Sequence, residues 1–269
     1  MKRINLIEFE DFSWFPVWLR NCMTNNIVVM ARWLGVTETL HHLILKVLSS
    51  HKIDKIVDLG SGSGGVLPDV IQQIRSLDDY EMVSLQLTDK YPNQQKAHDF
   101  NADHSNGIDY LTSSVDATDF TRIPAGLKTM VNCFHHMSPH QARTILESAK
   151  DNREPLLIYE MGGHHVMPFA LWLLSLPVAL PMIFCLALVI VPFVRPMTWQ
   201  HWFFSYLIPL IPFFYAWDGH ASIARIYDLN DLDQVLLGLE CSSYTWEKGF
   251  AISSRGNKLG TYLLGLPES

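Results

Sequence analysis

Val57-Asp58-Leu59-Gly60-Ser61-Gly62-Ser63-Gly64-Gly65 is the most informative segment of this chain. It follows the apolar run 53–57 and leads into the apolar-periodic run 66–71, so the order predicts a strand, a glycine turn and a helix. Glycines let the backbone pass close to a ligand, and the first turn of a helix presents free N–H groups to it. We therefore expect a nucleotide-like cofactor to bind in the N-terminal third of the chain.

Composition narrows the class of protein. The chain has 269 residues and a formal net charge of −7, which argues against a nucleic-acid binder because such proteins usually carry a basic face. Its four cysteines have no metal-binding spacing and are typical of buried thiols in a reducing compartment: Cys22, Cys133, Cys185 and Cys241. The first eight residues turn acidic at once and do not read as a secretory signal.

Strand and helix patterns alternate from residue 52 onward. Residues 1–50 read as helical, and strands are expected at 53–59, 82–88, 109–114, 128–134, 155–160, 243–246 and 261–266, with 249–260 between the last two. Ser138 is expected to cap a helix that runs to about Lys150, and Asp228 one that runs to Leu239. Alternation of this kind predicts a parallel sheet covered on both faces, with ligands beyond the carboxyl ends of its strands.

Three acids at predicted strand ends indicate which cofactor binds. Asp58 can accept from an ammonium group, Asp89 from both hydroxyls of a ribose, and Asp116 from an exocyclic adenine amine. The spacing Gly60-x-Gly62-x-x-Gly65 also fits the dinucleotide fingerprint. An NAD(P)-dependent oxidoreductase therefore stays open; it predicts a pyrophosphate at 62–66 and no role for Asp116.

With these motifs the chain resembles the class I S-adenosylmethionine-dependent methyltransferases. Residues 57–64 resemble the first motif of that family, Thr88-Asp89 its ribose-binding acid, and Val115-Asp116-Ala117 its adenine-binding acid. The resemblance covers about 50–160 and 225–269. It implies an α/β fold: a seven-stranded Rossmann-like methyltransferase sheet whose last two strands form an antiparallel hairpin.

Other segments resemble a bacterial subgroup of that family with an apolar insertion; they are 87–93, 134–137 and 217–220. The cofactor is then S-adenosylmethionine, and we expect its site to comprise Asp58, Gly60, Ser61, Gly62, Gly64, Asp89, Lys90, Asp116, Ala117 and Cys133.

The apolar insertion, residues 166–217, is almost free of charged residues. Residues 166–194 carry no charge, and neither do 196–217; a helix over 169–191 would be about 34 Å long, enough to cross a bilayer core. We expect three parts: an N-terminal helical lid at 1–50, a catalytic domain at 51–165 and 218–269, and an apolar helical hairpin at 166–217 that associates with a membrane, leaving the catalytic domain in the cytoplasm. A spanning hairpin, a monotopic anchor and a soluble cap over the active site all remain open.

The insertion follows the fifth predicted strand, so it leaves from the edge where the methyl group should lie. We therefore expect a hydrophobic, membrane-resident small molecule or lipid as the acceptor, methylated at oxygen. The catalytic candidates are His136, His135 and Glu160, because a histidine or carboxylate can take a proton from a hydroxyl. Acceptor contacts are expected from Trp14, Arg20, His165 and Asp218.

Two further expectations concern what the site holds and does. His135, His136, His164 and His165 lack the usual metal-binding spacing, so no metal is expected. A non-enzymatic membrane sensor that binds the cofactor without turnover also stays open. The sequence does not indicate the oligomeric state.

Overall fold

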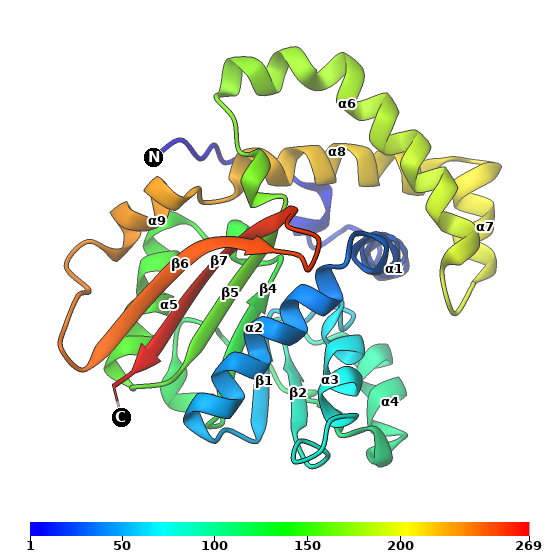
Figure 1. Cartoon of the computed structure of the whole chain (residues 1–269). Coiled ribbons are helices and arrows are strands. Elements are labelled where there is room, and N and C mark those ends of the chain that lie inside the picture. Colours follow the sequence, from blue (N-terminus) through cyan, green and yellow to red (C-terminus); the bar gives the residue numbers. More distant parts are fainter. Residues whose placement is uncertain (269) are drawn as a thin grey trace.

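A single sheet of seven strands forms the centre of the computed structural model, which describes residues 1–268 (Figure 1). The strands are β1 (Lys55–Leu59), β2 (Ser84–Thr88), β3 (Ile108–Tyr110), β4 (Leu127–Val131), β5 (Leu156–Met161), β6 (Tyr244–Ile252) and β7 (Lys258–Pro267). Their order is β3-β2-β1-β4-β5-β7-β6, with β1 to β5 parallel and β7 antiparallel to both of its neighbours. The predicted fold class, with its antiparallel final hairpin, is confirmed.

Helices cover both faces of this sheet. The α-helices are α1 (Val17–Leu34), α2 (Val36–His51), α3 (Leu67–Arg75), α4 (Gln94–Asn101), α5 (Pro139–Asp151), α6 (Phe169–Ile190), α7 (Trp199–Tyr206), α8 (Leu210–Arg225) and α9 (Leu229–Leu236). Single 3₁₀ turns are η1 (Phe9–Asp11), η2 (His104–Asn106), η3 (Phe120–Arg122), η4 (Phe134–His136), η5 (Gly163–His165) and η6 (Val191–Phe193). One apolar core packs α2 and α3 on the sheet, and a second packs α5 and α9 on its other face.

Strand order reverses between β1 and β4, which lie side by side although α3, β2, α4 and β3 separate them in the chain. In open α/β sheets, ligands bind in the crevice that opens at such a switch point. The glycine turn after β1 and the turn η4 after β4 therefore flank the expected site.

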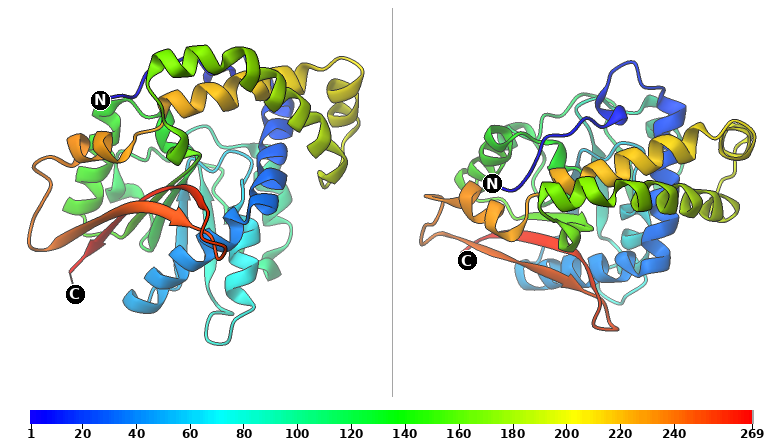
Figure 2. Two further views of the ribbon diagram at one scale, coloured as in Figure 1. Left: turned by 45° about the horizontal axis from the view of Figure 1, so that its top comes forward. Right: turned by 90° about the horizontal axis from the view of Figure 1, so that it is seen from above.

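The first sixteen residues differ from the predicted helical lid. Apart from η1 they form an irregular segment, which we call the N-terminal strap (residues 1–16), and Pro16 immediately precedes α1. Its first residues bind other elements: Ile4 N–H donates to the carbonyl of Ala224, and Lys2 and Arg3 N–H donate to the Asp231 carboxylate. Seen from above, the strap runs beside α8 (Figure 2).

Three strand boundaries also differ from prediction, each for a local reason. β4 ends at Val131 because Asn132 takes a positive φ of 56°. β3 ends at Tyr110, whose backbone N–H and carbonyl both bind the Asn101 side chain. The hairpin β6–β7 is longer than expected, because Gly249 lies within β6 under the ring of Tyr262 and only 253–257 turn.

The insertion forms three helices. α6 is bent in Figure 1 and contains Pro177 and Pro181, which remove backbone donors inside the helix. It packs against α8 along one side, and within α6 only Trp172, Ala187 and Ile190 are buried. Among the described residues, one helical stretch, Phe169–Phe193, is long and apolar enough to cross a membrane. α8 runs through residue 217, the expected end of the insertion, into the catalytic domain.

The N-terminus of α5 generates a stability prediction. The Ser138 side chain accepts from the Gln141 N–H and the Gln141 side chain accepts from the Ser138 N–H, which is a complete capping box. We expect Ser138→Ala to lower the free energy of unfolding by about 1 kcal/mol, measured by urea denaturation. Ser49→Ala, at an exposed hydroxyl in α2, should change it by less than about 0.5 kcal/mol; equal effects would contradict the cap.

Candidate cofactor and acceptor site

The glycine turn between β1 and α3 is shaped by residues without side chains. Gly60, Gly62 and Gly64 have φ values of 76°, 55° and 103°, which L side chains rarely adopt. A Cβ at Gly64 would lie 2.8 Å from the Phe100 ring, whereas one at Gly62 would meet nothing within 4 Å. The turn is thus packed on one side and open to a ligand at Gly62.

Asp58 lies behind this turn and is only 4% exposed. Its carboxylate accepts from the hydroxyls of Thr129, at 2.7 Å, and Ser61, at 2.6 Å. Burial raises the pKa of Asp58 to about 7, although these two hydrogen bonds oppose the shift. Both oxygens are therefore used to join β1, β4 and the turn.

Asp89 follows β2 and reaches the glycine turn. One carboxylate oxygen accepts from the Gly62 N–H at 2.8 Å and the other from the Tyr91 N–H at 2.7 Å. The predicted ribose acid therefore lies against the open part of the turn. The same part is held by Tyr110, whose hydroxyl donates to the Gly62 carbonyl.

Asp116 and Lys90 form an ion pair of 2.9 Å at the surface. Hydrogen bonds from Lys90 and Thr118 hold the pKa of Asp116 at about 2. Ala117 packs on the second core, and the Cys133 thiol donates to the carbonyl of Leu59 at 3.2 Å. The predicted cofactor residues thus lie at the end of β1, in the glycine turn, and in the loops that follow β2, β3 and β4.

His135 and Glu160 form a buried pair at the ends of β4 and β5. The ring Nδ1 lies 2.7 Å from Glu160 Oε2, and the His135 N–H donates to Glu160 Oε1 at 2.9 Å. Burial disfavours the charged imidazole, but Glu160 and Glu8 outweigh it and raise the pKa of His135 to about 10. Two of the three predicted catalytic residues are therefore in direct contact.

His136, the third, lies against the strap. Its Nδ1 is 2.7 Å from Asp11 Oδ1 and 3.3 Å from Glu8 Oε2. Arg225, from the end of α8, reaches the same two carboxylates, Asp11 at 2.5 Å and Glu8 at 3.2 Å.

We call this group of side chains the polar cluster; its members are Glu8, Asp11, His135, His136, Glu160 and Arg225. Glu8 and Arg225 are the two members that no sequence pattern predicted as site residues. The acidic run Glu8, Glu10 and Asp11 was the available signal for the strap carboxylates, but nothing in the sequence places that run on η4. Arg225 is the last residue of the mainly apolar helix α8 and has no local signal.

The four predicted acceptor residues do not line a common space. Asp218 accepts from the N–H groups of Phe9 and Glu10, and Arg20 donates to the Glu10 carbonyl, so both hold the strap. Trp14 is 62% exposed and stacks on Phe12. His165 is exposed on η5, next to His164.

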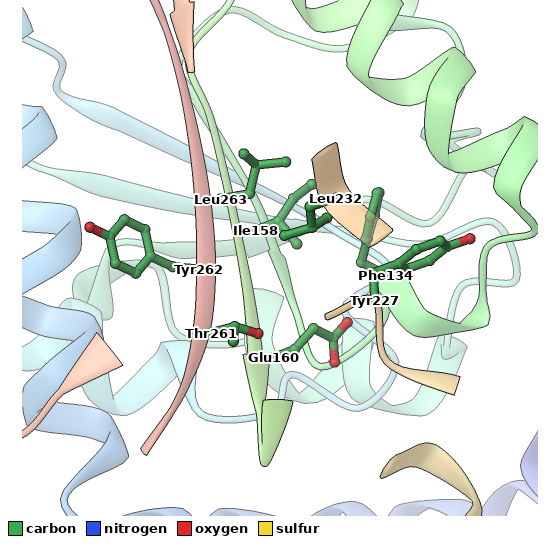
Figure 3. Close-up of a pocket in the computed structure, with 8 residues that line it drawn as sticks. All are labelled: Phe134, Ile158, Glu160, Tyr227, Leu232, Thr261, Tyr262 and Leu263. Atoms are coloured by element: carbon green, nitrogen blue, oxygen red, sulfur yellow. The ribbon is translucent and has the colours of Figure 1, made fainter. Parts of the chain in front are cut away.

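A small cavity lies beside Glu160, between β5, β7, η4 and α9 (Figure 3). It is lined by Phe134, Ile158, Glu160, Tyr227, Leu232, Thr261, Tyr262 and Leu263. Its volume of about 10 Å³ holds roughly one water molecule. The cavity is thus too small for an acceptor molecule, and the strap contributes Glu8 and Asp11 to the polar cluster beside it.

No protein-family model and no curated protein matches the chain. Solved structures resemble it at low identity. The methyltransferase domain of bacterial CtHen1 gives a TM-score of 0.48 at 11% identity, over 85% of this chain and 98% of that one. TnmH gives a TM-score of 0.47 at 15% identity, over 89% of this chain and 55% of that one.

A third likeness is to NcsB1, an O-methyltransferase from neocarzinostatin biosynthesis crystallised with S-adenosylmethionine. It gives a TM-score of 0.44 at 12% identity, over 81% of this chain and 50% of that one. The chain thus spans about half the length of TnmH and of NcsB1. These are likenesses of fold, and the function proposed below rests on this chain's own side chains.

The raised pKa of Asp58 predicts a pH dependence of stability. Between pH 4 and 7 the folded state keeps a proton that the unfolded state has released, so the free energy of unfolding falls as the pH rises. The fall is at most about 4 kcal/mol. The Asp58→Asn side chain would have the shape of the aspartate but no titratable proton. The free energy of unfolding of Asp58→Asn, measured with urea, should therefore fall less between pH 4 and 7 than that of the native chain. Parallel pH curves for the two proteins would contradict the assignment.

Proposed function

We propose that this chain is an S-adenosylmethionine-dependent methyltransferase that acts at oxygen on a hydrophobic, membrane-resident acceptor. The contact between Asp89 and the Gly62 N–H carries the proposal, because it joins the ribose-binding acid to the open part of the glycine turn. Asp116 and Lys90 lie further along the same edge, where an adenine would follow the ribose.

The start of α3 favours this cofactor over a dinucleotide. A pyrophosphate is bound by the free N–H groups of a helix N-terminus. Pro68 stands in the first turn of α3 and has no N–H, so one of these donors is missing. S-adenosylmethionine carries no pyrophosphate and therefore does not need the missing N–H donor.

Methyl transfer is an in-line displacement. The acceptor oxygen bonds to the methyl carbon as the carbon–sulfur bond breaks, and that electron pair stays on sulfur as a neutral thioether. The leaving group needs no acid, so the protein mainly supplies proximity and orientation. A hydroxyl acceptor must also lose its proton, and the polar cluster gathers imidazoles and carboxylates at the ends of β4 and β5.

The outer face of α6 supports a membrane-resident acceptor. Leu171, Leu174, Val178, Met182 and Val189 are all more than half exposed and lie on one face at helical spacing. An uncharged apolar face of this length on a monomer is typical of a membrane or partner surface. We propose contact with one leaflet, because α6 already packs its other face on α8.

The insertion and the strap form one layer. Phe15 of the strap and Leu19 of α1 pack with Ala187 of α6 and with Ile211 and Tyr215 of α8. In Figure 1, α6 and α8 lie together on one side of the sheet. Membrane contact and opening of the strap can therefore be coupled through this apolar packing.

A sensor that binds S-adenosylmethionine without turnover remains the second candidate. The burial of four of the six cluster members favours it, because a closed site does not admit an acceptor; these are Glu8, His135, Glu160 and Arg225. The two differ in one observable: a sensor binds the cofactor but transfers no methyl group.

Cofactor binding is tested by calorimetric titration with S-adenosylmethionine, S-adenosylhomocysteine and NADH. We expect both adenosyl ligands to bind, and Asp89→Ala to weaken them by at least tenfold because hydrogen bonds to a charged carboxylate are lost. Asp109→Ala, at an exposed carboxylate on β3, is the matched control and should bind normally. Binding of NADH alone would overturn the proposal in favour of an oxidoreductase.

Membrane contact is tested by flotation with vesicles of phosphatidylcholine and phosphatidylglycerol. We expect the protein to float with the vesicles, and the double variant Leu174→Glu/Val178→Glu to lose at least tenfold in partitioning, because a charge on the apolar face must be dehydrated. Leu237→Glu, at a residue 71% exposed after α9, is the control. Equal flotation of both variants would rule out α6 as the contact surface.

A further inference from the structure

We propose that Glu8, His135 and His136 bind a divalent transition-metal ion, with Asp11 as a further ligand. One donor atom from each of the first three lies within 4.8 Å of the others. Glu8 Oε2 is 3.3 Å from His136 Nδ1 and 3.8 Å from His135 Nε2. Ligands about 2.1 Å from a tetrahedral ion are roughly 3.4 Å apart, so these separations are close to those of a bound site.

Buried atoms without hydrogen bonds converge here. Glu8 is fully buried and neither carboxylate oxygen has a hydrogen bond, although Oε2 forms an ion pair with Arg225 Nη1 at 3.2 Å; His135, 5% exposed, has no hydrogen bond at Nε2. A buried carboxylate without hydrogen bonds is costly. An ion between Glu8 and His135 would satisfy both groups at once.

Glu160 supplies the outer shell that such a ligand needs. It binds His135 through Nδ1, which orients the ring and leaves Nε2 directed toward Glu8. Metal-bound histidines usually give their second nitrogen to a carboxylate in this way. His164 and His165, from the four-histidine set considered in the sequence, stack on each other on η5 and do not take part.

Donor type and charge define the ion. Two imidazoles with carboxylates suit Zn²⁺, Mn²⁺ or Fe²⁺ better than Mg²⁺ or Ca²⁺, which prefer all-oxygen sites. Glu8, Glu10, Asp11 and Glu160 carry two more negative charges than Arg3 and Arg225 supply when the histidines are neutral. A dication balances this excess. Arg225 lies 3.2 Å from Glu8 Oε2 and 3.4 Å from His136 Nδ1, so it must give up these two contacts and keep only Asp11 when an ion binds. Two protonated histidines would balance it equally, and that ion-pair network is the competing account.

The site joins the strap to the end of β4, because Glu8 comes from the strap and both histidines from η4. While no acceptor is bound, an ion here would hold the strap closed. When an acceptor enters, the ion would polarise its hydroxyl group. This second role rests on the proposed function, whereas ion binding itself does not.

Zinc binding to the full-length, chelator-treated protein tests the proposal, by titration calorimetry and by elemental analysis after dialysis. We expect one ion per chain and a higher melting temperature with zinc present. His135→Ala and Glu8→Gln should weaken binding at least a hundredfold, and Glu160→Gln by about 10–100-fold. His140→Ala, at an exposed histidine on α5, is the control and should bind as the native chain does.

Two results would overturn the metal site: no zinc bound by the folded native chain, or binding that His135→Ala and His136→Ala leave unchanged. Circular dichroism of each variant without zinc separates lost ligands from lost folding. S-adenosylmethionine is not used, so a negative result leaves the methyltransferase proposal standing and returns the cluster to an ion-pair network.

Discussion

The buried contact between Glu160 and His135 holds the carboxyl ends of β4 and β5 in one arrangement. Glu160 accepts from both the backbone and the ring of His135. Removing one partner of such a buried pair costs about 3–5 kcal/mol, because the other is left charged and unpaired. Glu8, Asp11 and Arg225 then gather around the imidazoles that this contact fixes, and the strap follows them.

Two layers with different chemistry meet at this point. The sheet presents a glycine turn and acids at the carboxyl ends of β1 and β2, which suit a charged nucleoside. Above it, the strap, α6 and α8 pack through apolar side chains such as Phe15, Ala187 and Tyr215. The polar cluster lies where the two layers meet, which is where the proposed acceptor and methyl donor would react.

The sequence predicted those features that are set by adjacent residues, such as strands, turns and helix caps. The glycine turn and Asp89 each follow a strand with its own local pattern, so the sheet and the positions of these residues could be predicted; cofactor binding there stays a prediction. Ser138 and Asp228 cap their helices as expected. The β6–β7 hairpin was underestimated because Gly249 is read as a turn residue, yet here its missing side chain makes room for Tyr262.

Contacts between segments that are distant in the chain could not be predicted from the sequence. Asp11 and His136 are 125 residues apart, and Asp11 and Arg225 are 214 apart. No periodicity or motif spacing encodes such a pairing, which arises only when η4 and α8 pack on the strap. The same reason explains Asp218: it follows an apolar run as a turn residue would, but within α8 it binds the strap backbone.

The most direct test of the account is transfer of a labelled methyl group from S-adenosylmethionine to a bacterial membrane lipid extract. The account predicts label in the organic phase with the native chain, and none above background with Asp89→Ala. Normal binding of S-adenosylmethionine by the native chain with no label in any lipid fraction would contradict it and identify a cofactor-binding protein that has no such activity.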